Sequence, residues 1–141
     1  MIRELRKADI DKAAEIWLDT NIKVHDFIPA QYWESNFESV KELLPQATVY
    51  VYEDDQGIQG FIGLNDEYIE GIFVSDGMQS QGIGRLLLDY AKTKRNKLRL
   101  NVYRKNTRAI AFYQREGFEI LCSGIDEATG EKDHVMEWRR K

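Results

Sequence analysis

The chain has 141 residues, of which 43% are hydrophobic and 31% charged, and its formal net charge is −4. This length and composition predict one globular domain over residues 1–141, because the apolar share is high enough to offset the entropy of ordering the chain. No apolar run approaches the ~20 residues of a membrane helix, and the first residues lack the apolar segment of a signal peptide, so we expect a cytoplasmic protein without a membrane partner. The acidic balance argues against duplex nucleic acid as a partner.

Cysteine and histidine usage excludes two further classes of site. The single cysteine, Cys122, cannot form an internal disulfide, and we expect it to be a buried, inert thiol on a strand. The two histidines, His25 and His134, lie far apart and have no partners at metal-ligand spacing. We therefore expect no metal.

The first third of the chain predicts a short strand over 2–6 and two helices. Asp9 stands where its carboxylate can cap the first helix, whose apolar residues recur at helical spacing from Ile10 to Leu18. Residues 23–31 interrupt this pattern. A second helix is expected over 32–44, before a proline.

Three consecutive strands are predicted next. Residues 48–52 are rich in β-branched and aromatic side chains, and a turn over 54–57 separates them from a second strand over 58–64. A third strand is expected over 68–74, which makes an antiparallel meander. Gly71 lies inside this third strand, where glycine often marks a bulge or a close approach by a ligand.

The second half of the chain predicts two helices among three more strands. The first helix carries a buried stripe at helical spacing, made of Ile83, Leu86, Leu87, Tyr90 and Ala91. A strand over 98–102 follows, and Asn106 can cap a helix over 107–116 that Gly117 ends. Strands over 118–122 and 135–139 complete an α+β domain.

The segment Gln79-Ser80-Gln81-Gly82-Ile83-Gly84 stands between a predicted strand and a predicted helix. Unpaired N–H groups in the first turn of a helix, with roughly half a positive charge from the helix dipole, can bind a pyrophosphate that the glycines let approach closely. Arg85 adds a neighbouring positive charge. A P-loop needs Gly-x-x-x-x-Gly-Lys-Ser/Thr and a dinucleotide-binding turn needs Gly-x-Gly-x-x-Gly near the first strand, and this segment has neither pattern.

This segment matches the Gln/Arg-x-x-Gly-x-Gly/Ala signature of the GCN5-related N-acetyltransferases. Val74 stands five residues before Gln79, as the end of the corresponding strand does in that family, and residues 106–118 reproduce its pattern Asn-x-x-Ala-x-x-Phe-Tyr-x-x-x-Gly-Phe. Asp76 departs from the proline that many members carry. The element order is also similar, so the chain resembles this family from end to end. The segments at residues 25–28, 32–33 and 103–106 look like those of a small bacterial subgroup associated with acetylation of protein lysines.

The resemblance implies a mixed, mainly antiparallel sheet that is flanked by helices and split between its central strands, near Val74 and Val102. The co-substrate would then be acetyl-CoA, with no metal. Backbone groups of Phe73 and Val74 are expected to pair with its pantetheine arm, and Asn106 is expected to contact it. The residues expected to hold the pyrophosphate are Gln79, Gln81, Gly82, Ile83, Gly84 and Arg85.

The implied chemistry is direct transfer of the acetyl group to an uncharged amine. Attack on the thioester needs an N–H donor for the oxyanion, such as that of Val74, and a group that stabilises the leaving thiolate. Tyr113 is the candidate for that second group, since its family position is beside the sulfur. Alternation along the strand places Glu70 on one face with Tyr68, which makes Glu70 a candidate base; Glu67 is the alternative.

The acceptor is expected to be a primary amine, foremost that of a protein lysine. Candidate residues of the acceptor pocket are Tyr68, Trp17, Phe27 and His25, the last of which could orient the acceptor or act as a base. Two alternatives stay open: an enzyme for a small amine such as an antibiotic, a polyamine or an amino acid, and a non-enzymatic module that senses acyl-CoA.

Overall fold

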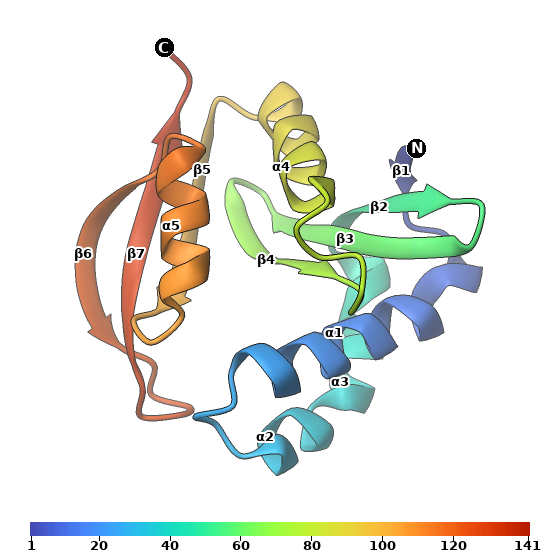
Figure 1. Ribbon diagram of the computed structural model, residues 1–141, viewed down its shortest axis with the longest axis horizontal. Coiled ribbons are helices and arrows are strands. Elements are labelled where there is room, and N and C mark those ends of the chain that lie inside the picture. The colour runs from blue at the N-terminus through green and yellow to red at the C-terminus, as the bar shows by residue number, and fades with distance from the viewer.

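A single seven-stranded sheet organises the computed structural model, which describes residues 1–141 (Figure 1). The strand order is β1-β2-β3-β4-β5-β7-β6, and every pair is antiparallel except β4 with β5. This is the predicted mixed, mainly antiparallel sheet. The strands are β1 (Ile2–Glu4), β2 (Thr48–Asp54), β3 (Gly57–Asn65), β4 (Tyr68–Val74), β5 (Lys97–Tyr103), β6 (Glu119–Ile125) and β7 (Lys132–Arg139).

Helices cover both faces of this sheet (Figure 1). The N-terminal helices pack on one face, where Ala13 and Ala14 of the first helix lie against Val51 and Phe61 in one buried cluster. The later helices pack on the other face, where Leu87 and Tyr113 join a second cluster with Leu100. The helices are α1 (Ile10–Val24), α2 (Ala30–Ser35), α3 (Phe37–Leu43), α4 (Ile83–Lys94) and α5 (Thr107–Arg115).

Strands β4 and β5 separate soon after they meet. Their register contains one partner pair, Tyr68 with Arg99, whereas β3 and β4 pair from Gly60 to Tyr68. The two strands therefore diverge from the start of β4 toward Val74. The predicted split between the central strands is confirmed.

Several local predictions are wrong in detail. The predicted helix over 32–44 is two helices that break at Asn36, whose Nδ2 donates to the carbonyl oxygen of Tyr32. Leu86 is 48% exposed, because α4 turns Leu88 into the core instead. Cys122 is exposed rather than buried, because β6 is the outer strand of the sheet and none of its residues is covered.

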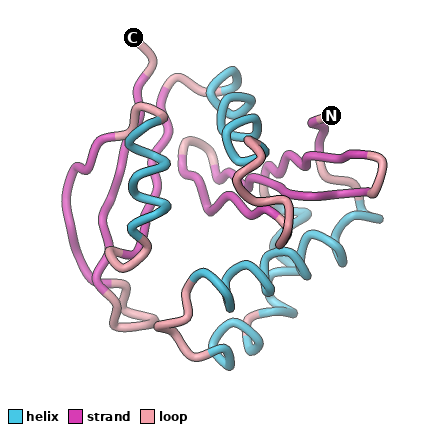
Figure 2. Tube along the Cα trace, in the orientation of Figure 1, coloured by secondary structure: helices cyan, strands magenta, loops and turns pink.

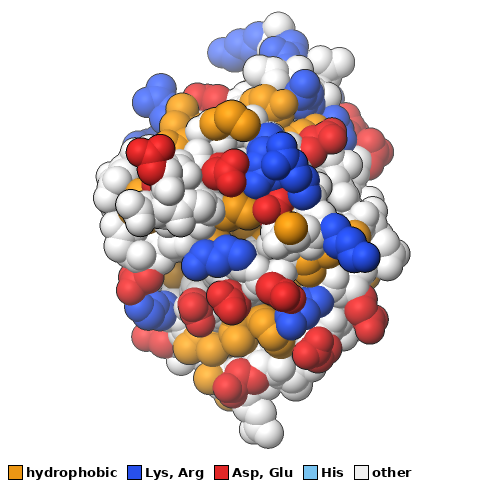
Figure 3. Space-filling model, turned by 90° about the vertical axis from the view of Figure 1, so that its right-hand side faces the viewer, with side chains coloured by type: hydrophobic (Ala, Val, Ile, Leu, Met, Phe, Trp, Pro, Cys, Tyr) orange, Lys and Arg blue, Asp and Glu red, His pale blue; other side chains and the backbone are white.

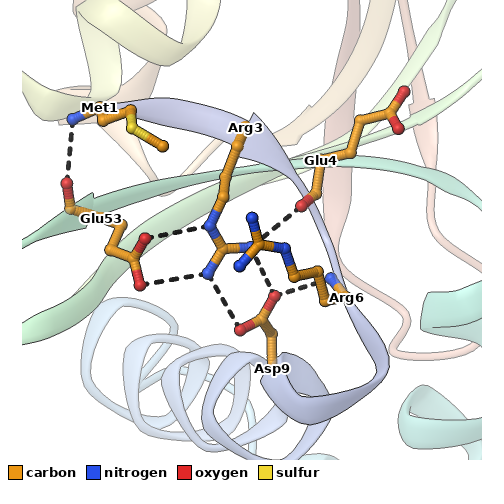
Figure 4. Close-up of polar contacts among 6 residues, drawn as sticks. All are labelled: Met1, Arg3, Glu4, Arg6, Asp9 and Glu53. Carbon is orange, nitrogen blue, oxygen red and sulfur yellow. Dashed lines mark hydrogen bonds and ion pairs between the residues drawn. The ribbon is translucent and has the colours of Figure 1, made fainter.

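The Arg3 cluster ties the N-terminus to the edge of the sheet (Figure 4). The Arg3 guanidinium donates to both carboxylate oxygens of Asp9, at 2.7 and 3.1 Å, and to both of Glu53, at 3.0 and 3.2 Å. Asp9 also accepts from the backbone N–H of Arg6. The predicted cap of α1 is therefore wrong: the Asp9 carboxylate serves Arg3 and makes no capping hydrogen bond to the helix.

The helices are short, and the surface charges are of mixed sign. The longest helix, α1, has 15 residues, and no helix combines the length and apolar character required to cross a membrane. On the face shown in Figure 3, basic and acidic side chains alternate, so this face carries no continuous patch of one sign.

Candidate active site

A cleft of about 810 Å³ lies where β4 and β5 diverge. Its lining residues come from the C-terminal half of α1, from α2, β4 and β5, from the start of α4, from α5 along its length, and from the loop between β6 and β7 with the start of β7. These segments are far apart in the sequence. The split in the sheet brings them together, so the cleft exists because β4 and β5 do not pair further.

The glycine loop, residues 75–82, carries the chain from β4 into α4 (Figure 2). Gly82 has a φ of 86°, a left-handed conformation that favours glycine, and no side chain caps the first turn of α4. Ser80 is also left-handed, with a φ of 66°, and its Oγ accepts from the Arg108 guanidinium. The first-turn N–H groups of α4 are thus available to an anion.

Three arginines, Arg85, Arg108 and Arg115, line the cleft beside the glycine loop, and we call this the basic end. The Arg85 side chain is 69% exposed, and its Nε lies 3.8 Å from carboxylate oxygens of Asp89 and Glu116. Guanidinium groups and helix N–H groups are the donors that phosphates prefer. The residues of the basic end therefore fit the phosphates of a CoA-type molecule.

Along β4, the backbone N–H and C=O groups of alternate residues point away from β3, toward the free edge of the strand. The N–H of Ser75 donates to the Gln59 carbonyl of β3, so in this antiparallel pair Phe73 also directs its backbone groups to β3. Val74 and Ile72 point the other way, into the split. The Val74 carbonyl accepts from Thr20 Oγ1, at 3.4 Å, and its N–H faces the cleft side of the strand. Of the two predicted backbone partners, Val74 is suitably placed and Phe73 is not; Ile72 was missed.

Glu70 sits on a β-bulge. In the register of β3 with β4, Gly63 pairs with Gly71 and Leu64 with Ile69, so Glu70 is the extra residue. The predicted alternation of Tyr68, Glu70 and Ile72 on one face is wrong, because the bulge shifts the pattern. Ile72 packs instead on the same buried cluster as Ile69, whereas Glu70 is exposed and lines the cleft. The bulge turns the carboxylate toward the split.

Gly71 is required beside this bulge for packing. A Cβ at Gly71 would lie 2.4 Å from the ring of Phe73, which folds over the glycine and contacts Phe61 at 5.0 Å between ring centroids. The prediction that Gly71 marks a bulge is confirmed. The close approach there is made by Phe73.

Tyr113 lies on α5 with its ring between those of Phe112 and Phe118, at centroid distances of 5.2 and 5.3 Å. The residue is 8% exposed and lines the cleft. Burial raises the pKa of its phenol above the usual value, and no protein hydrogen bond contributes to the shift. At neutral pH the phenol is therefore a protonated donor.

Asn106 and His25 meet across the cleft. Asn106 caps α5, since its Oδ1 accepts from the N–H of Ala109 at 3.2 Å, and this confirms the predicted cap. Its Nδ2 lies 3.3 Å from Nε2 of His25, which stands at the end of α1. Both residues line the cleft, as does Trp17 of α1.

The acidic end of the cleft is formed by the carboxylates of Glu70, Asp126 and Asp133. None of these three makes an ion pair with a lysine or arginine. Asp133 is 8% exposed and accepts from Nδ2 of Asn101 at 3.2 Å. Buried carboxylates usually have a cationic partner, so the acidic end suits a cationic ligand.

Tyrosine hydroxyls surround these carboxylates. Tyr103 donates to Oδ2 of Asp126 at 2.6 Å, and Tyr68 donates to Oδ1 of Asn101 at 2.9 Å. Burial, followed by the charge of Asp126, raises the pKa of Tyr32; burial, followed by the charge of Glu70, raises that of Tyr68. These tyrosines therefore remain uncharged at neutral pH.

Two predicted site residues do not line the cleft. Gln81 is exposed and its Nε2 donates to the Gly77 carbonyl within the glycine loop. Phe27 packs behind the wall, 5.7 Å from the ring centroids of both His25 and Tyr103. The other predicted residues line it: Trp17, His25, Tyr68, Glu70, Phe73, Val74, Gln79, Gly82, Ile83, Gly84, Arg85, Asn106 and Tyr113.

The residues around the acidic end that the sequence analysis missed come from the loop between β6 and β7, from the start of β7 and from β5. Asp126, Asp133 and Asn101 belong to this group. No local motif marks them. They join the cleft because β7 inserts between β5 and β6, which places the ends of this loop beside β5.

Comparison with known proteins agrees with this geometry. A family model described as an acetyltransferase (GNAT) domain matches residues 45–120. Peptidyl-lysine N-acetyltransferase YiaC of Escherichia coli (strain K12) is 32% identical over 98% of this chain and 96% of its own length. The solution structure of apo-form YjaB from Escherichia coli has a TM-score of 0.87 at 24% identity and covers 100% of this chain and 98% of its own.

A further solved structure of similar fold contains coenzyme A. The paia N-acetyltransferase of Thermoplasma acidophilum in complex with coenzyme A has a TM-score of 0.77 at 22% identity, over 99% of this chain and 98% of its own. The predictions of an acyltransferase and of acetyl-CoA as co-substrate are confirmed. The chain belongs to the GNAT family of acetyltransferases.

Proposed function

We propose that this acetyltransferase modifies the side-chain amine of lysine in proteins. The observation that carries the proposal is the division of charge along the cleft, with three arginines at the basic end and three unpaired carboxylates at the acidic end. The basic end suits the phosphates of CoA, which leaves the acidic end for the acceptor. The E. coli relative named a peptidyl-lysine N-acetyltransferase supports lysine as that acceptor.

The acidic end fits an alkyl ammonium for two reasons. Carboxylates that lack a protein cation attract a cationic ligand, and at Asp133 the ligand also offsets the free energy of burying the charge. The rings of Tyr32, Tyr68 and Tyr103 can contact the methylene groups of a lysine and attract its charge through their π faces. Together these groups hold the acceptor in its charged form before it reacts.

Glu70 is the base that removes the acceptor's proton. An ammonium has no free electron pair, so it must lose a proton before it can attack the thioester. Glu70 is the member of the acidic end that lies on β4, and the bulge turns its carboxylate into the split. We assign it the proton transfer, directly or through one water molecule.

Val74 and Tyr113 stabilise the charges that develop as the acetyl group moves. The thioester supplies an activated carbonyl carbon and a thiolate leaving group. The N–H of Val74, at the free edge of β4, donates to the carbonyl oxygen as it becomes negative. Tyr113 donates a hydrogen bond to the sulfur. Because the pKa of Tyr113 is raised above 10 and that of a thiol is about 8.5, the phenol stabilises the thiolate while keeping its own proton.

The test is the release of free CoA from acetyl-CoA, corrected for spontaneous hydrolysis. One set of reactions contains lysine peptides with a blocked N-terminus, and the other contains polyamines, amino acids and aminoglycosides, with products identified by mass. Acetylated lysine in the peptides alone is the expected result. Products in the small-amine set alone would move the assignment to a metabolite or resistance enzyme. Binding of acetyl-CoA without any product would favour a sensor.

A further inference from the structure

Three side chains form a hydrogen-bonded relay that joins α1 to the start of α5. Nδ2 of Asn21 donates to the carbonyl oxygen of Trp17 at 2.9 Å. Oδ1 of Asn21 lies 3.0 Å from Nδ1 of His25, and Nε2 of His25 lies 3.3 Å from Nδ2 of Asn106. The last member is bonded to the N–H of Ala109. The relay thus begins and ends on backbone groups.

Those two backbone groups fix the direction of every hydrogen bond between them. The carbonyl of Trp17 can only accept, so Asn21 must turn its NH2 group toward it and its oxygen toward His25. The N–H of Ala109 can only donate, so Asn106 must turn its oxygen toward α5 and its NH2 group toward His25. His25 therefore faces an acceptor at Nδ1 and a donor at Nε2.

We propose that His25 is a positioning residue, held as the neutral tautomer with its proton on Nδ1, and that it orients Asn106 as a hydrogen-bond donor toward acetyl-CoA. One N–H of the Asn106 amide is used by His25, and the oxygen is used by the cap of α5. The second N–H is what Asn106 can offer to the cleft. This inference deepens the proposed function, because it rests on Asn106 contacting the cofactor.

The same relay removes His25 from the candidates for the base. Nδ1 already carries its proton, and the lone pair of Nε2 is occupied by Asn106. Protonation would place an N–H of His25 against the NH2 group of Asn106. Relief would require Asn106 to flip, which would turn its NH2 group toward Ala109 and remove the cap of α5. The geometry therefore opposes a second proton on the ring.

Aromatic side chains hold the ring in place. His25 stacks on Trp33 at 5.6 Å between ring centroids, with an interplanar angle of 30°, and Tyr103 meets it edge-on at 5.0 Å. Charged groups stand one ring farther away: Asp126 is bonded to Tyr103, and Lys105 lies over Phe27 at 5.3 Å. Burial alone lowers the pKa of His25 to about 4, in agreement with a neutral ring.

Imidazole ¹⁵N NMR at pH 7 tests the tautomer directly, because the chain has two histidines. His134 is exposed to solvent in part and its Nδ1 lies 2.7 Å from Oγ of Ser123, so it serves as the internal control. We expect His25 to show a protonated Nδ1 and an unprotonated Nε2. A proton on Nε2, or a charged ring, would overturn the relay whether or not the chain binds acetyl-CoA.

Calorimetric titration with acetyl-CoA tests the effect on Asn106. In His25→Phe an aromatic ring remains but the Nε2 acceptor is lost. We expect the Kd to rise about 5- to 10-fold, the equivalent of one hydrogen bond. In His25→Gln the side-chain oxygen can still accept from Asn106, and the Kd should stay within about 2-fold. His134→Phe is the matched control. Unchanged affinity in His25→Phe would overturn the positioning role, whereas a wild-type protein that does not bind acetyl-CoA would overturn the proposed function.

Discussion

The Arg3 cluster and the acidic end of the cleft are both groups of carboxylates, and they differ in their partners. In the Arg3 cluster, one guanidinium lies between two carboxylates and bonds all four of their oxygens (Figure 4). At the acidic end, the carboxylates receive hydrogen bonds from neutral groups, such as Tyr103 to Asp126, and no cation. The first cluster is satisfied within the protein. The second has capacity for a ligand.

This difference separates residues that stabilise the fold from residues that serve the reaction. Removal of a group from the Arg3 cluster leaves a partly buried charge without its partner, so stability should fall. Removal of a carboxylate charge that pairs with no protein cation, or of a hydroxyl without a protein partner, should leave stability nearly intact and change turnover or binding. Variants in each region test that separation in both directions.

Tyr113→Phe should give the largest effect. The hydroxyl has no partner in the protein, so its loss removes the donor to the leaving sulfur, and we expect kcat to fall on the order of 10²-fold or more with little change in the Kd for acetyl-CoA. Steady-state kinetics and calorimetric binding check this. Tyr90→Phe, the same change on α4 outside the cleft, is the control. Turnover equal to the wild type would remove Tyr113 from the mechanism.

Arg3→Met should destabilise the protein by about 2 kcal/mol, because Asp9 would keep a buried charge without its cation. Urea unfolding measures this free energy. Arg6→Met removes the same charge three residues further along the chain, where only the backbone N–H is bonded to Asp9, and should change stability by less than about 0.5 kcal/mol. Equal changes in the free energy of unfolding for the two variants would show that the ion pairs of Arg3 add no stability beyond that of an exposed charge.

Glu70→Gln should lower kcat/KM about tenfold. This is below the usual range for a general base, because the carboxylate is exposed and bulk water can accept part of the proton flux. The loss should shrink at high pH, where more acceptor is already neutral. The control is Glu67→Gln, which removes a carboxylate that pairs with Lys97 outside the cleft. A larger loss in the control would transfer the role of base to Glu67.

Acidification should weaken the surroundings of His25 and the Arg3 cluster in different pH ranges. Burial lowers the pKa of His25 from 6.5 to about 4, so between these values the unfolded chain binds a proton that the folded protein does not, and stability falls as the pH falls. Hydrogen bonds from Arg3 lower the pKa values of Asp9 and Glu53 from 3.8 and 4.5. The stability that these two carboxylates contribute is present above about pH 4.5 and is lost below it, as the pH passes through their pKa values in the folded protein.

Unfolding free energies between pH 2 and 8 separate these ranges. His25→Gln should flatten the curve between about pH 6.5 and 4 and leave the lower part unchanged, whereas Arg3→Met should flatten the part below about pH 4.5. Identical curves for the two variants would contradict the assignment of the upper range to His25.

Local pattern predicted most of the fold. The meander, the glycine loop and the cap of α5 follow from residues close in sequence, such as the turn over 54–57 and Asn106, because their conformations depend on nearby backbone chemistry. The break at Asn36 was missed, and Gly71 indicated a bulge without showing that Glu70 is the inserted residue. Each is a one-residue irregularity inside a regular pattern, and sequence periodicity alone does not reveal where such a residue is inserted.

The site was predictable in its cofactor half and less so in its acceptor half. The residues around Gly82 form a motif on one strand-to-helix connection. Asp126 and Asp133, in contrast, reach the cleft through the order of β5, β7 and β6, which only the three-dimensional sheet shows. Asp9 illustrates the same limit, since a residue suited to a helix cap is used instead by Arg3.

The central claim is that the acidic end binds the acceptor and does not hold the fold together. The most direct test is the double variant Asp126→Asn, Asp133→Asn, with Asp55→Asn in the exposed turn as the control, measured for lysine-peptide kinetics and for urea unfolding. We predict that KM for the peptide rises about tenfold while the free energy of unfolding stays within about 1 kcal/mol of the wild type or increases. An unchanged KM together with a loss of stability would contradict the account.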